Sequence, residues 1–403
     1  MGMIINIDEA LKQRTAYNVL KEPLHMMLQR QQEEWEKQNP IDLLFKRGTL
    51  SGFQETYTSS IGFEHAFKET SDYAVGEIFN TAEGFAATYT SRTFQGSFII
   101  TQQVLEDGKA GQVKDDATQF LKRWHGDTVE YAMTAIDSGF GVERVFEGSR
   151  LRLTSADTTD GDVNLNGTNS KNPLFTKSHK TVKRSADATP ITQSNMYYAG
   201  LGSTGNHEAA ITINGEDATR VSKLADFINM VITDMENYKD DNGKRAGVSG
   251  QKIIVAPNDA RLKAALEAAV SMEMFGPEPN VAFKRAIVKT TPYLNDINAC
   301  SNAKGFFIVD PEYNAGNHGP EFTERVPLTL EATWTKRPMG VIYDGRQRFD
   351  INVASWRGIV YCALVASTTS TDWNYYDKFT EITPVSIVKP VAVVNTVSTK
   401  SVS

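Results

Sequence analysis

The stretch Val113–Phe140 limits the fold of this chain more than any other, because its apolar and small residues recur at helical spacing. They are Val113, Ala117, Phe120, Leu121, Trp124, Tyr131, Ala132, Ala135 and Ile136, with charged residues between them. At a rise of about 1.5 Å per residue, the predicted helix is roughly 40 Å long, about the width of a small domain. Asp115 and Asp116 would lie in its first turn, where the helix dipole favours negative charge, and Ser138-Gly139 would end it. We therefore expect a spine helix onto which other elements pack.

Composition limits the class of protein. The chain has 403 residues, enough for more than one compact unit, and only two cysteines, which rules out a disulfide framework. The sequence contains no uninterrupted apolar run near the ~18 residues that a membrane span needs. The formal charge of −7 argues against a dedicated nucleic-acid binder, whose affinity comes from clustered Lys and Arg.

Residues 1–50 are polar and mostly helical in pattern. Asp8 can cap a first helix, Pro23 is expected to interrupt it, and a narrow apolar stripe then resumes and reaches Trp35. Such a helix has little to bury within its own chain. We expect either a solvated arm or an arm that completes its burial on a neighbouring chain.

Residues 51–101 are rich in Thr, Ser, Gly and aromatic side chains, among them Phe63 and Phe67. Ala86–Thr93 and Phe94–Thr101 alternate as strands do, and we expect them to join near Gln95-Gly96. Because a hairpin with few local partners is marginal in water, these aromatic side chains predict packing against another part of this chain or against another chain.

A small α/β unit follows within residues 190–325. Its expected elements are a helix over Val221–Met235, a strand over Lys252–Ala256, a helix capped by Pro257-Asn258-Asp259, and strands over Ala286–Lys289 and Phe306–Val309. The remainder is β-rich, with strands expected over Leu328–Trp334, Val341–Tyr343, Phe349–Val353 and Arg357–Val365, and with Asp344-Gly345 as a turn. The fold class predicted from these elements is α+β.

Few residues have the spacing of a chemical site. Asp162–Gly167 matches the first half of a calcium loop, but Pro173 occupies the position of the closing Glu, which favours a solvated loop. Gly200–Gly205 reads G-x-G-x-x-G, yet a strand and not a helix is expected after it, so it does not match a dinucleotide loop. The six histidines show no metal-ligand spacing, and a lone thiol such as Cys300 is usually inert. We predict no catalytic residue, no cofactor and no metal.

The order of segments resembles the major capsid proteins of tailed bacteriophages, those with the Hong Kong 97-like fold. The most specific local similarity is Asn172–His179 followed by Gln193-Ser194-Asn195, which is similar to a Leu-Phe-Ser-Thr-Ala-His-Pro element followed by Gln-Ser-Asn in one branch of that family. The sequence departs from that element at Lys177, Ser178 and Lys180. Two further stretches are also similar to the second half of that family, Thr290–Leu294 and Arg337–Asp350.

The resemblance implies an architecture and a function. Its segments would be an N-arm (1–50), an extended β-hairpin E-loop (51–101), a peripheral domain with the spine helix (102–189), an axial domain (190–325), returning peripheral strands (326–370) and a C-terminal tail (371–403). It implies a structural protein of the virion, made in the host cytoplasm, that forms hexamers and pentamers of an icosahedral shell around DNA held non-specifically. It also implies a portal and, because an arm of about fifty residues leaves no room for a scaffolding segment, a separate scaffolding protein.

This resemblance makes Trp35, Phe63 and Phe67 the predicted intersubunit contacts. The covalent crosslink of the family joins a lysine of the E-loop to a distant asparagine. Lys68 is the only lysine in 53–101, and we assign no such pair from the sequence. The alternatives are an enzyme with a ligand site near Gly200–Gly205 and another structural protein of the virion.

Overall fold

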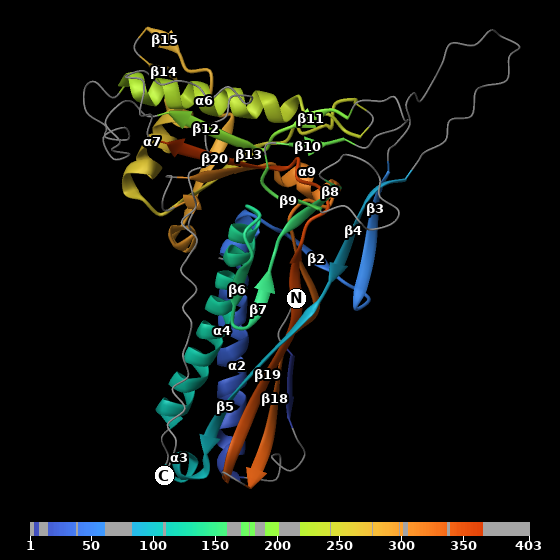
Figure 1. The fold of residues 1–403 in the computed structure, drawn as a ribbon. Helices are drawn as coiled ribbons and strands as arrows, with labels where there is room; N and C mark the ends of the chain where they lie inside the picture. Colours follow the sequence, from blue (N-terminus) through green and yellow to red (C-terminus); the bar gives the residue numbers. More distant parts are fainter. Residues whose placement is uncertain are drawn as a thin grey trace, which may run out of the picture.

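The computed structural model describes a long body and a smaller cap, arranged as Figure 1 shows. The described residues are 4–7, 15–37, 39–60, 83–107, 110–158, 171–176, 178–181, 190–200, 218–241, 243–275, 277–297, 299–300, 305–336 and 339–365. Among them no helix is both long and apolar enough to span a membrane. The α+β class with a long spine helix, expected from the sequence, is confirmed.

The body consists of two helices lying side by side against a sheet (Figure 1). The helices are α2 (Thr15–Lys37) and α4 (Ala110–Ser138), and the short α3 (Gln102–Glu106) precedes α4. We call the sheet the long sheet, and its strands are β1 (Ile4–Ile7), β2 (Lys46–Thr49), β5 (Arg92–Thr101), β18 (Glu321–Lys336) and β19 (Met339–Asn352). Their order is β1-β18-β19-β5, and β2 also pairs with β18.

The cap is a five-stranded sheet with helices α6 (Ala218–Glu236) and α7 (Ala260–Ser271). We call this five-stranded sheet the cap sheet, and its strand order is β12-β20-β17-β13-β16. The strands are β12 (Met196–Gly200), β13 (Lys252–Pro257), β16 (Ala286–Thr291), β17 (Phe306–Val309) and β20 (Ile359–Val365). The expected helices and strands of this unit are confirmed, including the cap at Asp259, whose side chain accepts from the backbone of Arg261 and Leu262.

Shorter elements connect these parts. They are η1 (Pro40–Leu43), β3 (Gln54–Ser60), β4 (Glu83–Thr90), β6 (Arg144–Phe146), β7 (Ser149–Leu151), β8 (Thr154–Thr158), β9 (Lys171–Pro173), β10 (His179–Lys180), β11 (Thr192–Gln193), β14 (Met274–Phe275), β15 (Glu278–Pro279), η2 (Pro292–Asp296) and α9 (Pro311–Gly316). β3 and β4 form a hairpin that stands off one side of the body in Figure 1.

The spine helix serves two hydrophobic cores. Val113, Ala117 and Leu121 pack with Ile100, Leu330, Val341 and Tyr343 of the long sheet and with Leu28 of α2. Further along the helix, Val129, Ala132 and Ile136 belong to the core that also contains the cap sheet. The predicted stripe is therefore confirmed, although α4 begins at Ala110, so that Asp115 and Asp116 lie beyond its first turn.

Two glycines predicted to lie at turns are instead paired inside strands. Gly96 of β5 lies opposite Gly345 of β19, and a Cβ on either would come within 3.2 Å of Trp124 Cζ3. The Trp124 indole donates to Gln347 Oε1 over 2.7 Å. The glycines leave room for an indole from α4 to approach the sheet backbone, so the expected turns at Gln95-Gly96 and Asp344-Gly345 are wrong.

Two further expectations fail for identifiable reasons. Pro23 does not interrupt the first helix, because α2 runs through it; packing of α2 on α4, with Leu28 fully buried, outweighs one missing hydrogen bond. The expected strand Arg357–Val365 is not a returning strand of the body. It forms β20, which pairs with β12 and β17 in the cap sheet. A strand covered on both faces reads as a continuous apolar run, as Ile359–Val365 does.

The paired glycines give a stability prediction. Gly345→Ala should destabilise the protein by about 1 to 3 kcal/mol, because its Cβ would crowd Trp124 and the Gly96 carbonyl at 3.2 to 3.3 Å. Gly126→Ala in α4 is the control: nothing lies within 4 Å of its Cβ, and alanine in a helix should stabilise by about 0.5 to 1 kcal/mol. Urea unfolding of both variants measures the difference, and equal effects would contradict the role assigned to Gly345.

Candidate functional site

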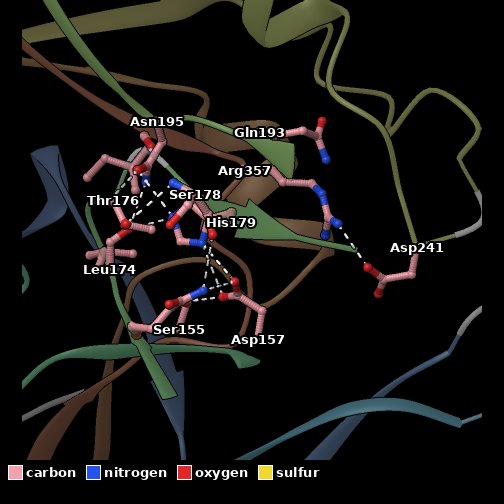
Figure 2. Close-up of polar contacts among 12 residues, drawn as sticks. Ser155, Asp157, Leu174, Thr176, Ser178, His179, Gln193, Asn195, Asp241 and Arg357 are labelled. Atoms are coloured by element: carbon pink, nitrogen blue, oxygen red, sulfur yellow. Dashed lines mark hydrogen bonds and ion pairs between the residues drawn. The ribbon is translucent and has the colours of Figure 1, made fainter. Parts of the chain in front are cut away.

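The sequence element that carries the family resemblance folds into a buried polar cluster between body and cap. β8 supplies Ser155 and Asp157, β9 supplies Asn172, β10 supplies His179, and Asn195 directly precedes β12. Figure 2 shows Ser155, Asp157 and Asn195 converging around the His179 ring. We call the five residues the junction cluster. The two segments that are similar to the family element, Asn172–His179 and Gln193–Asn195, thus contact each other in the structure.

His179 is fully buried and faces hydrogen-bond acceptors at both ring nitrogens. Its Nδ1 lies 3.0 Å from Asp157 Oδ2, and its Nε2 lies 3.1 Å from the Leu174 carbonyl and 3.2 Å from Asn195 Oδ1. The orientation of the Asn195 amide is fixed, because its Oδ1 accepts from the Thr176 N–H and its Nδ2 donates to the Leu174 carbonyl. Both imidazole nitrogens therefore face hydrogen-bond acceptors, and Nδ1 pairs with the Asp157 carboxylate.

The Asp157 carboxylate is also fully engaged. It accepts from the Ser155 hydroxyl and, over 2.7 Å, from Asn172 Nδ2. Burial opposes its ionisation, but the His179 charge and these hydrogen bonds outweigh burial and hold the pKa of Asp157 below its ordinary value. A buried ion pair with every lone pair satisfied fixes one geometry of the surrounding chain.

The junction cluster is joined to the cap by Trp356. The indole stacks on the His179 ring at 4.0 Å and 5°. Arg357 places its Cζ 5.2 Å from the Trp356 ring, pairs with Asp241 at 3.0 Å and donates to the Lys239 carbonyl. These contacts tie the segment after the spine helix to the loop after α6. Sequence reasoning missed Asp157 and Trp356; Asp157 stands at the start of a Ser-, Thr- and Asp-rich stretch, where no spacing distinguishes it.

Of the predicted contact residues, only Trp35 lies within the described residues. It is half-buried in α2 and stacks on His125 of α4 at 4.5 Å and 4°. Burial lowers the pKa of His125 to about 4, and its Nε2 lies 2.7 Å from Gln32 Oε1. α2 therefore completes part of its burial within its own chain. Phe63 and Phe67 lie outside the described residues, as does Lys68, and their roles stay predictions.

The weaker chemical motifs gain no support. Asp162–Gly167 and Gly202–Gly205 lie outside the described residues, and Gly200 ends β12. Cys300 is buried, and burial raises its thiol pKa, which is the opposite of what a nucleophile needs. The described part of the chain brings no three His, Cys, Asp or Glu side chains together in a metal-binding group.

Large apolar side chains are exposed at opposite ends of the molecule. Met272, Met274, Val281 and Ile287 are each about half exposed, around β14 and the edge strand β16 of the cap. Met339, 59% exposed, begins β19 at the far end of the body (Figure 1). Phe53 is exposed just before the β3–β4 hairpin. These side chains lie on separate elements of the described structure.

No family model matches the sequence, and no curated protein matches it. Solved structures do match. The chain is similar to the capsid of Myoviridae phage XM1, with 11% identity and a TM-score of 0.41 over 80% of this chain and 90% of that one. It is similar to the mature capsid of bacteriophage PhiM1, with 9% identity and a TM-score of 0.40 over 80% and 85%. It is also similar to a structure from Mycobacterium phage Patience, with 13% identity and a TM-score of 0.43 over 93% and 95%.

The ion pair of the junction cluster gives a testable prediction. Asp157→Asn should destabilise the protein by about 3 to 5 kcal/mol, because it removes the buried carboxylate that pairs with His179 and accepts from Ser155 and Asn172. Asp42→Asn is the control, since it breaks the exposed Asp42–Arg47 pair and should cost under about 1 kcal/mol. Urea unfolding at pH 7 measures both variants. A loss below about 1 kcal/mol for Asp157→Asn would contradict the charged pair.

The pH dependence of the same pair has a defined sign. A carboxyl whose folded pKa is depressed contributes stability that is complete above its unfolded value, here 3.8, and that is lost as pH falls through the folded pKa. The gap in unfolding free energy between wild type and Asp157→Asn should therefore narrow as pH falls below about 4.

His125 predicts a separate pH effect. Its folded pKa of about 4 lies below the ordinary value of 6.5, so protonation favours the unfolded chain between these values. Wild type should lose up to about 2 kcal/mol between pH 7 and 4.5, and His125→Gln should lose less over that range. Unfolding free energies at the two pH values test this prediction, and an unchanged pH slope in His125→Gln would refute it.

Proposed function

We propose that this chain is a structural subunit that forms hexamers and pentamers, and that these close into the icosahedral capsid of a tailed bacteriophage around its DNA. The observation that carries the proposal is the β3–β4 hairpin, which leaves the body without a strand partner on either side. β3 pairs with β4, and neither pairs with any other described strand.

The hairpin packs on the body along one face of β4. Phe85, Ala87 and Tyr89 of β4 pack in a small cluster with Leu50 and Ala156. A two-stranded hairpin is at best marginally stable alone in water. The other face of the hairpin, with Thr56, Ala86 and Thr88, is exposed, so a surface outside this chain is the natural partner for it. A second copy of the subunit supplies such a surface in a shell.

The exposed apolar positions support contacts in more than one direction. A shell subunit contacts several neighbours at once, so it needs separate contact surfaces. The cap edge with Met274 and Ile287, the body end with Met339 and the hairpin base with Phe53 are three such surfaces on different elements. A monomeric enzyme needs none of them.

The segments then take the roles that the sequence resemblance implies. Residues 1–50 act as the N-arm, the β3–β4 hairpin as the base of the E-loop, the body as the peripheral domain and the cap as the axial domain. The net charge of −7 keeps an inner wall from adhering to packaged DNA. A separate scaffolding protein and a portal complete the set of proposed partners, and no cofactor is required.

Substitutions at the cap edge test the proposal. Met274→Ser with Ile287→Ser should prevent assembly while leaving a folded subunit, because both side chains are about half exposed and contribute little to the core. Sedimentation of the co-expressed protein measures shells against free subunits, and circular dichroism checks the fold. The control is Lys263→Ser, an exposed position on the neighbouring helix α7.

The outcomes separate the alternatives. Loss of shells in the double variant but not in the control supports the proposal, whereas wild-type protein that never assembles overturns it. Phe63→Ser and Phe67→Ser are expected to behave as the double variant does. Trp35→Ser should in addition lower the stability of the subunit, because Trp35 stacks on His125.

A further inference from the structure

A polar cavity of about 190 Å³ lies where the hairpin strand β4 meets the body. The polar part of its wall includes Thr88 and Thr90 from β4, Arg92 from β5, Thr154 from β8, Lys171 from β9 and Asn352 from β19. Arg152, just before β8, also lines it. The cavity therefore lies at the junction between the hairpin and the body, where contacts determine the angle between them.

The cavity carries more positive than negative charge. Arg92, Arg152 and Lys171 line it, and Asp350 is the one carboxylate among the described lining residues. The Asp350 carboxylate already has partners: it pairs with Arg92 Nε at 3.0 Å and accepts from the Tyr131 hydroxyl at 2.6 Å. Two cations remain without a counter-charge from this site.

Arg152 and Lys171 have no ion pair with any described residue. Lys171 Nζ donates to the Ala86 carbonyl over 3.0 Å, a neutral acceptor. Burial lowers the pKa of Lys171, as expected for an ammonium that is partly removed from water without an anion beside it. All three side chains are exposed, but the neighbouring Arg150 differs in having a counter-charge, Glu143, at 3.6 Å.

We propose that this cavity binds a small oxyanion, a phosphate or carboxylate group, between Arg152 and Lys171. A guanidinium offers two parallel N–H donors to such a group, and an ammonium adds a point charge. The threonine hydroxyls on the wall supply further donors. The group can come from free phosphate in solution or from an Asp or Glu side chain of a second copy.

Binding has a mechanical consequence. Lys171 and Arg152 belong to the segments of β9 and β8, whereas Thr88 and Thr90 belong to β4. An oxyanion contacting both sets joins the hairpin to the body and restricts its angle. This site does not depend on the proposed function; if the chain forms a shell, occupancy fixes the direction in which the hairpin reaches its neighbour.

The test uses the full unassembled chain and inorganic phosphate. Isothermal titration and thermal unfolding are followed at constant ionic strength, with chloride replacing phosphate. Wild type should bind phosphate saturably at one site and its Tm should rise with phosphate concentration. Arg152→Gln and Lys171→Gln should each weaken binding at least tenfold, while Lys171→Arg, which keeps the charge, should bind within about threefold of wild type.

Arg150→Gln is the matched control, since it removes the same charge two residues away and should leave binding unchanged. Equal phosphate responses in wild type and Arg152→Gln would mean an adventitious ion only and would overturn the site, as would no saturable binding to wild type. If phosphate binds the free chain but not assembled shells, a carboxylate of a second copy occupies the site in the shell. Binding to both identifies free phosphate as the occupant.

Discussion

The structure depends on one helix being shared by two hydrophobic cores. The first half of α4 buries Val113, Ala117 and Leu121 against the long sheet, and its last turns bury Val129, Ala132 and Ile136 in the core of the cap. Because the side chains at both ends of α4 are close-packed, the helix fixes the position of one core relative to the other. The long body and the cap therefore keep one relative arrangement, which a subunit with contacts at several distant surfaces requires.

A polar lock reinforces this arrangement where the chain leaves the spine helix. The His179–Asp157 pair, the Trp356 stack and the Arg357–Asp241 pair join three segments that are distant in sequence. Buried ion pairs add little net stability compared with apolar packing, but they penalise any alternative geometry, because a displaced partner leaves a buried charge unpaired. Apolar packing thus orients the cap on the body, and the buried ion pairs disfavour other orientations. The hairpin is joined to the body by neutral contacts instead: the Asn352 side chain bonds the Thr90 backbone, and the Tyr57 ring packs against His318.

Local patterns predicted the elements well, and tertiary contacts explain where they failed. The stripe of α4 and the Asp259 cap of α7 depend on neighbours within one or two turns, so the sequence alone reveals them. Gly96 and Gly345 resemble turn residues locally. They are needed because Trp124 packs against them, and Trp124 is too distant in sequence for this contact to show in the local pattern. β20 was assigned to the wrong sheet, because a buried strand shows no alternation that would tell which sheet it joins. In the junction cluster, His179 and Asn195 were noticed through the family resemblance, whereas their partner Asp157 is one Asp in a polar stretch.

The most direct test of the capsid proposal is electron microscopy of the full chain, expressed alone and together with the reading frames that neighbour its gene. The account predicts closed icosahedral shells, or rings of six and five subunits, in which the β3–β4 hairpin of one subunit lies on the next. A monodisperse monomer under both conditions would contradict it.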